Sequence, residues 1–256
     1  MTTAPLSATA ASDSGTSTHD YVLEGPKWGT STAPASAGGV VTYSFATGDY
    51  SGQPFHFDTP TLDHAYQDAV RSAFADWSHV ANITFKEVAD SAASDIRIGW
   101  EKIDGPYHVL AQTTYSYDMQ GHMQHAWVGF DDGEFYAPSG PNGAPTLSDG
   151  FTFEAIATHE IGHAIGLDHY NAATAIMNAV ISTNSLQTPD IDGIDAIYGA
   201  APAAVVASAA TPPVSADDNI APIPENSGDL FDSTGAGTNV HHHYHHVHHA
   251  TDWLMA

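Results

Sequence analysis

Alternating apolar and polar positions divide the first half of the chain into strands and one long helix. Residues 40–45 (VVTYSF) are β-branched and aromatic, which is typical of a strand. Residues 62–80 place large apolar side chains at helical spacing, which predicts a long helix with one apolar stripe. Further strands are predicted at 83–88, 95–100, 108–115 and 125–130.

The second half of the chain predicts two more helices. Asp149 and Thr152 are residues that can cap the start of a helix, and they precede FEAIATHEIGHAIG. Gly166 is predicted to end this helix. Thr188 and Pro189 then open a last helix through IDGIDAIYG. The predicted order is β-α-β-β-β-β-α, a loop, and α.

The patterned part of the chain is flanked by segments of biased composition. Residues 1–20 are small and polar and are interpreted as a flexible leader, so residues 21–200 form the predicted domain. Residues 201–240 are rich in Ala and Pro, which indicates a linker. Residues 241–256 begin with a histidine-rich tract that could hold zinc or nickel.

Charge excludes several classes of partner. The chain has 30 acidic and 5 basic residues, and no Lys or Arg follows Lys102. Such a surface repels phosphate backbones and anionic lipids, so nucleic-acid binding is not expected. No apolar run is long enough for membrane insertion. The chain has no cysteine, which rules out disulfides and thiol chemistry within it. As a separate expectation, we predict a monomer.

A metal-binding pattern lies in the predicted helix that precedes Gly166. His159 and His163 are four residues apart, so both imidazoles project from one face and can bind one ion. Glu160 follows the first histidine, where its carboxylate can reach a water on that ion. Zinc lowers the pKa of such a water to about 7, and a carboxylate can then take its proton.

The pattern continues beyond the two helical histidines. In HEIGHAIGLDH, Gly166 allows a sharp turn that returns His169 as a third ligand. Three nitrogen ligands leave one position open, which is the catalytic arrangement of zinc. Met177 follows eight residues later, which completes the metzincin signature.

With these motifs the chain resembles the matrixin family of metzincins over residues 21–200. The resemblance also rests on YVLEGPKW, AFADWSHVANITFKEV, SDIRIGW and TPDIDGIDAIYG. Serralysins are the nearest rivals, but they carry a tyrosine two residues after the methionine, where this chain has Ala179. The resemblance implies an α/β zincin fold: a twisted five-stranded sheet with an antiparallel edge strand at 108–114, an active-site helix and a closing C-terminal helix.

The same resemblance implies a zinc-dependent endopeptidase that acts on proteins or peptides. Glu160 would be the general base, and Met177 would pack beneath the zinc without binding it. The substrate would add as a strand to the edge that contains Val109, Leu110 and Ala111. The alternative is a non-catalytic zinc-binding or zinc-storage protein that uses the histidine-rich tail, although the intact Glu160 favours the enzyme.

The resemblance further implies a calcium site. The segments IDGPYHVLAQ and VGFDDGE match two matrixin loops that bind calcium and a second, structural zinc. Carboxylates and carbonyls suit Ca²⁺, although these residues could also be turn residues on an acidic surface. The expected ligands are Asp104, Gly105, Tyr107, Asp131 and Glu134.

The structural zinc itself is not expected. Two of its histidines correspond to Gln112 and Gly129, and the nearby His108, His122 and His125 are interpreted as surface or strand residues. We therefore expect one zinc in the domain. A matrixin pro-segment cysteine is also missing, so that latency switch cannot operate in this chain.

The two ends of the chain suggest a route of secretion. The first 20 residues lack the basic and apolar regions of a Sec-type signal peptide. Asp252 is followed by Trp253, Leu254, Met255 and Ala256, which resembles the C-terminal signal that serralysins present to ABC-type exporters. We therefore expect a secreted protein that leaves the cell in one step.

Overall fold

The computed structural model describes residues 20–58, 61–106, 108–138, 140, 143–203 and 239–241. The main elements follow the predicted order. They are β2 (Gly39–Phe45), α1 (His64–Val80), β3 (Ile83–Glu87), β4 (Ile96–Glu101), β5 (Ala111–Tyr117), β6 (Met123–Asp131), α2 (Phe153–Ala164) and α3 (Thr188–Tyr198).

Short strands pair outside this framework. β1 (Val22–Leu23) pairs antiparallel with β9 (Leu167–Asp168), and β7 (Ala137–Pro138) pairs antiparallel with β8 (Pro145–Thr146). The pairing of β1 with β9 brings the start of the domain beside the segment that immediately precedes His169.

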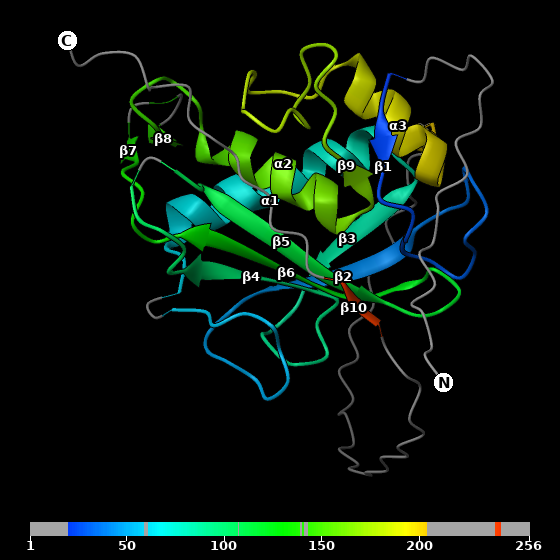
Figure 1. Ribbon diagram of the computed structural model, residues 1–256, viewed down its shortest axis with the longest axis horizontal. Helices are drawn as coiled ribbons and strands as arrows, with labels where there is room; N and C mark the ends of the chain where they lie inside the picture. Colours follow the sequence, from blue (N-terminus) through cyan, green and yellow to red (C-terminus); the bar gives the residue numbers. More distant parts are fainter. Residues whose placement is uncertain are drawn as a thin grey trace, which may run out of the picture.

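Strands β2 to β6 form the twisted mixed sheet (Figure 1), which confirms the predicted α/β class and five-stranded core. Their order is β5-β6-β4-β2-β3. The pairs β2–β3, β2–β4 and β4–β6 are parallel, whereas β5 runs antiparallel to β6. The strand β5 covers Ala111–Tyr117, so it begins and ends three residues later than the edge strand predicted at 108–114.

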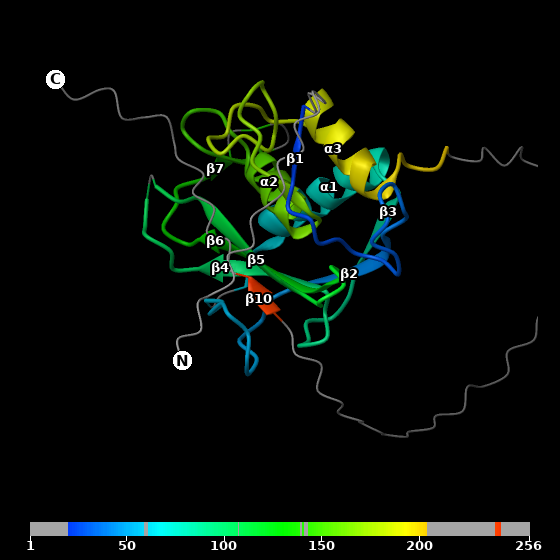
Figure 2. The ribbon, with the colours of Figure 1, turned by 45° about the vertical axis from the view of Figure 1, so that its right-hand side comes forward.

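A sixth strand, β10 (Asn239–His241), pairs antiparallel with the outer edge of β5 at Tyr115–Tyr117 (Figure 2). Sequence reasoning placed residues 239–240 in a linker and His241 in the histidine-rich tract. The backbone of these three residues joins the sheet because an edge strand offers unpaired N–H and C=O groups. The rest of the histidine-rich tract and the predicted export signal lie outside the described residues.

The three helices lie over one face of the sheet (Figures 1 and 2). Helix α1 begins at His64 and not at residue 62 because the Asp63 side chain accepts from the backbone N–H groups of Ala65 and Tyr66. Its buried stripe ends in Trp77, whose indole N–H donates to Thr158 O in α2 at 2.9 Å. No described helix has both the length and the apolar character to cross a membrane.

Helix α2 is buried along nearly its whole length because the sheet lies under it and α1 lies beside it. The Thr152 side chain caps its first turn by accepting from Ala155 N. The carbonyls at its other end are satisfied from distant segments: Trp28 Nε1 donates to Ala164 O and Tyr198 Oη donates to Ile165 O, both at 2.8 Å. The helix that carries the metal-binding pattern is therefore fixed at both ends.

Candidate active site

The three predicted zinc ligands converge in the core above β5. His159 and His163 lie one turn apart on α2, and Gly166 ends the helix with a φ of 108°. That turn returns the chain so that His169 Nε2 lies 3.3 Å from His159 Nε2, while His163 Nε2 lies 3.1 Å from the same atom. Within the described part of the chain, these histidines form the one group of three candidate ligand residues whose atoms all lie within 4.8 Å.

The hydrogen bonds of two rings define which nitrogens face inward. His159 Nδ1 donates to Ile176 O at 2.7 Å, and His163 Nδ1 donates to Leu167 O at 2.8 Å, because a carbonyl oxygen can only accept. In a neutral ring with its proton on Nδ1, Nε2 carries a lone pair, so both Nε2 atoms can bind a cation that lies between them. Burial and the neighbouring His169 lower the pKa of His159 to about 3, which keeps this ring neutral.

The spacing of the inward nitrogens fits zinc. Lone pairs that face each other at 3.1 Å repel unless a cation lies between them. A tetrahedral zinc with Zn–N distances of about 2.0–2.1 Å separates its nitrogen ligands by about 3.3 Å. His159, His163 and His169 therefore have the donor atoms and the separations that a three-histidine zinc site requires, and the hydrogen bonds of two rings imply the tautomer that it needs.

Glu160 lies beside the triad and is fully buried. Its Oε2 accepts from the Thr113 hydroxyl of β5 at 2.7 Å, while no described group makes a hydrogen bond to its Oε1. Burial raises the pKa of Glu160 to about 8, against the opposing effect of the Thr113 hydrogen bond. A dication at the adjacent histidines would favour the ionised carboxylate.

The turn that contains Met177, here called the Met-turn, packs beneath α2. Met177 is buried, and a Cβ added to Gly162 would lie 2.4 Å from its Sδ, so the methionine needs glycine at that turn of the helix. The buried Asp190 carboxylate of α3 accepts from Ile176 N at 2.8 Å and from Met177 N at 3.1 Å. Since Ile176 O in turn holds the His159 ring, Asp190 positions a ligand that it does not touch.

The residues expected to bind calcium occupy two adjoining loops. The buried Asp131 carboxylate accepts from Gly105 N at 2.7 Å, from Asp104 N at 3.2 Å and from Gly133 N at 3.1 Å. Asp104 Oδ1 accepts from Val109 N at 3.2 Å. The carboxylates of Asp104, Asp131 and Glu134 do not form a convergent ligand group in the described residues, and Tyr107 lies outside them.

Glu101 lies beside Gln112 and Gly129, which occupy the positions of two histidines of the matrixin structural zinc site. Gln112 Nε2 donates to Glu101 Oε2 at 2.8 Å, and a Cβ added to Gly129 would lie 2.2 Å from the same oxygen. The Glu101 carboxylate thus covers Gly129 where a histidine side chain would have to lie. The nearby histidines do not gather here: His122 binds Asp118, and His125 lies 3.3 Å from Ser94 O.

The predicted substrate edge begins just before β5. Val109 and Leu110 are buried and precede the strand, and Ala111 is its first residue. Leu110 O accepts from Asp131 N at 3.0 Å, so this carbonyl faces the sheet. β10 covers Tyr115–Tyr117, and no other described strand pairs with the outer edge of Ala111–Thr114.

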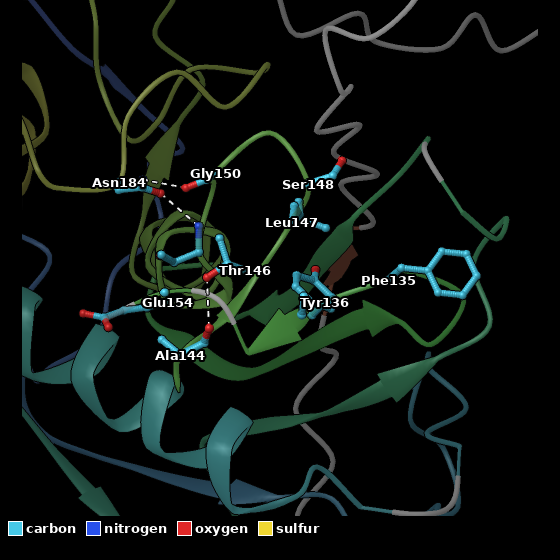
Figure 3. A pocket seen from close by; sticks show the side chains of 12 residues that line it. Phe135, Tyr136, Ala144, Thr146, Leu147, Ser148, Gly150, Glu154 and Asn184 are labelled. Carbon is cyan, nitrogen blue, oxygen red and sulfur yellow. Dashed lines mark hydrogen bonds between the residues drawn. The ribbon is translucent and has the colours of Figure 1, made fainter. Parts of the chain in front are cut away.

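A large pocket lies near the N-terminal end of α2 (Figure 3), and none of the residues that line it belongs to the triad. Its walls include Tyr136, Leu147 and Asn184. Asn184 fixes the segment after the Met-turn to the start of α2: its Nδ2 donates to Gly150 O and its Oδ1 accepts from Thr152 N, both at 3.0 Å.

Comparison with known proteins identifies the relatives of this arrangement. The Matrixin family model matches residues 38–199, more than half of the chain. Metalloendoproteinase 1 of Glycine max is 32% identical over 155 residues, which is 56% of this chain and 48% of that protein. Matrix metalloproteinase-19 of Homo sapiens is 34% identical over 149 residues, covering 53% and 26% of the two chains.

A third relative is Karilysin of Tannerella forsythia, which is 30% identical over 170 residues, or 63% of this chain and 30% of that protein. The chain thus matches about half or less of the length of these relatives. The matched family region contains α2, the triad and Met177, but it begins after β1 and Glu24.

Replacing Asp190 tests how the closing helix supports the site. In Asp190→Asn, an amide NH₂ replaces one of the oxygens that accept from Ile176, Met177 and Gln187, so a donor faces a backbone N–H. We expect the free energy of unfolding to fall by about 2–3 kcal/mol in urea titrations. The exposed Asp192→Asn on the same helix is the control, and equal stability of the two variants would contradict the assignment.

Proposed function

The chain belongs to the matrixin family, and on this premise we propose that it is a zinc-dependent endopeptidase that hydrolyses peptide bonds in proteins. The observation that carries this proposal is the three-histidine group with Glu160 next to it in the sequence and on the same helix. Three protein nitrogens leave a coordination position for water or substrate, which separates catalytic from structural zinc sites.

The roles of the side chains follow from their positions. Zinc at the triad would polarise the scissile carbonyl and lower the pKa of a coordinated water to about 7. Glu160 would accept a proton from the attacking water and later deliver it to the leaving amine. The Thr113 hydroxyl donates a hydrogen bond to one oxygen of Glu160 and so fixes the orientation of the carboxylate. The other oxygen would accept and return the proton.

We further propose that the substrate binds as an extended strand along the outer edge of Ala111–Thr114. Thr113 in this segment contacts Glu160 directly, so a peptide on this edge would pass the catalytic base. The antiparallel pairing of β10 with Tyr115–Tyr117 supports the proposal, because the adjoining part of the same edge already accepts a strand in that direction.

The alternative, a zinc-storage protein, has less support. It depends on the histidine-rich tail and assigns no role to the triad. It also leaves unexplained why a carboxylate is buried beside the triad and held by Thr113. Secretion through an ABC-type exporter and a monomeric state remain predictions from the sequence.

The enzyme proposal predicts that Glu160→Ala separates catalysis from metal binding. Casein hydrolysis should fall by about 100-fold to 10,000-fold, because a positioned base is lost. Zinc content, measured by elemental analysis, should stay at one per chain since Glu160 is not a ligand. His169→Ala should lose both zinc and activity, and Glu154→Ala on the same helix is the matched control. Near-native hydrolysis by the Glu160 variant would overturn the assignment of the base.

We also propose a structural calcium ion bound by the two loops around Asp104 and Asp131. Asp104 and Asp131 lie in these two adjoining loops, and Gly133 packs on the Gly105 backbone so closely that an added Cβ would lie 2.7 Å from Gly105 Cα. Oxygen ligands on adjacent loops suit Ca²⁺, which tolerates irregular geometry. The ion would join loops that Asp131 already links by accepting from their backbone amides.

This site predicts that Asp104→Ala loses calcium and melts at a lower temperature than the native protein in calcium-containing buffer. Zinc should remain, because the triad lies elsewhere. Asp132→Ala, a partly exposed acidic neighbour in the same loop, controls for the loss of one negative charge. If elemental analysis finds no calcium in the native protein at millimolar free calcium, the site does not exist.

A further inference from the structure

A second buried carboxylate lies beside the triad, on the side away from the inward nitrogens. Glu24 Oε1 lies 3.7 Å from His163 Nδ1, and the side chains of Glu24 and His163 are 3% and 0% exposed. The Nε2 atom of the same ring faces His159, so the carboxylate lies behind the ligand and not in its coordination shell.

The N-terminal segment fixes the backbone of Glu24 to the loop that carries the third ligand. Glu24 N donates to Gly166 O at 2.9 Å, next to the pairing of Leu23 with Leu167. Gly166 is required at this crossing, since an added Cβ would lie 2.8 Å from Pro26 O. The carboxylate therefore has a defined place relative to His163 and His169.

The other carboxylate oxygen is anchored from the sheet. Tyr115 Oη of β5 donates to Glu24 Oε2 at 2.9 Å, and Tyr115 is 1% exposed. The hydrogen on His163 Nδ1 already goes to Leu167 O at 2.8 Å. At 3.7 Å Glu24 is too distant to accept it as well, so the carboxylate acts on the ring through its charge when it is ionised. Burial raises the pKa of Glu24 to about 7, so this charge is fully present only above that pH.

We infer that Glu24 is a positioning residue for the metal, whose negative charge strengthens zinc binding by His163. Coordination at Nε2 draws electrons from the imidazole and makes its Nδ1–H side more positive. A carboxylate held behind that side stabilises the loaded ring more than the empty one through the attraction of opposite charges. The inference rests on the proposed zinc site, and it makes the N-terminal segment part of that site.

Full-length Glu24→Gln tests the charge without changing the shape. The glutamine oxygen can still accept from Tyr115, so the zinc-free protein should keep the native circular dichroism and melting temperature. Zinc affinity, measured at pH 8 by competition with a chromogenic chelator, should fall by about 10-fold to 100-fold, because one nearby opposite charge is lost. Glu24→Asp retains the charge and should bind zinc more tightly than Glu24→Gln.

Two control variants separate charge from packing. Glu101→Gln alters another partly buried glutamate whose Oε2 accepts one side-chain hydrogen bond, from Gln112. Gln112 is adjacent to Thr113 and points to the opposite face of β5, so this variant should bind zinc like the native protein. Tyr115→Phe removes the hydroxyl that holds Glu24 but keeps the charge, and it should reduce stability more than zinc affinity.

Native zinc affinity in Glu24→Gln would overturn the inference, and so would equal losses in Glu24→Asp and Glu24→Gln. A joint fall of melting temperature and affinity to the same extent in Glu24→Gln and Tyr115→Phe would reduce Glu24 to a packing role. The zinc measurement is independent of peptidase activity. A native protein that binds zinc but cleaves no protein would refute the proposed enzyme and leave the role of Glu24 standing.

Discussion

The convergence of three imidazoles on one point, with nitrogens 3.1 and 3.3 Å apart, is the constraint on which the surrounding structure depends. Such rings repel one another unless each is held in place and a cation lies between them. Backbone carbonyls at Ile176 and Leu167 hold two of the rings by accepting from Nδ1. Both carbonyls belong to segments outside α2, so the site forms only when the fold around that helix is complete.

Distant segments complete that fold through specific polar contacts. Asp190 fixes the turn that presents Ile176 O, and Trp28 and Tyr198 satisfy the last carbonyls of α2. Met177 fills the space that Gly162 leaves open. The closing helix and the N-terminal segment are therefore supports of the metal site, although neither carries a ligand.

The sequence predicted what depends on local spacing. His159 and His163 could be identified because residues four apart share a helix face, and the order of strands and helices followed from apolar periodicity. Glu24 could not be assigned a role, because it meets Tyr115 across 91 residues of sequence. Glu101 and Asp190 escaped notice for the same reason, and the pairing of β10 has no local signal. The limits of β5 differ from the predicted edge strand, because pairing with β6 and not residue type defines where the strand begins and ends.

Charge gives the metal a further role in stability. The chain buries Glu24 and Glu160 beside the triad, and a buried carboxylate is costly without a compensating charge. The two buried basic side chains among the described residues lie elsewhere: Lys27 donates to carbonyl oxygens such as Ile197 O, and Arg97 pairs with Asp90. A dication at the histidines would compensate both carboxylates at once. Zinc binding would then stabilise the folded chain beyond its three coordinate bonds, because the unfolded chain has no such pair of buried charges to offset.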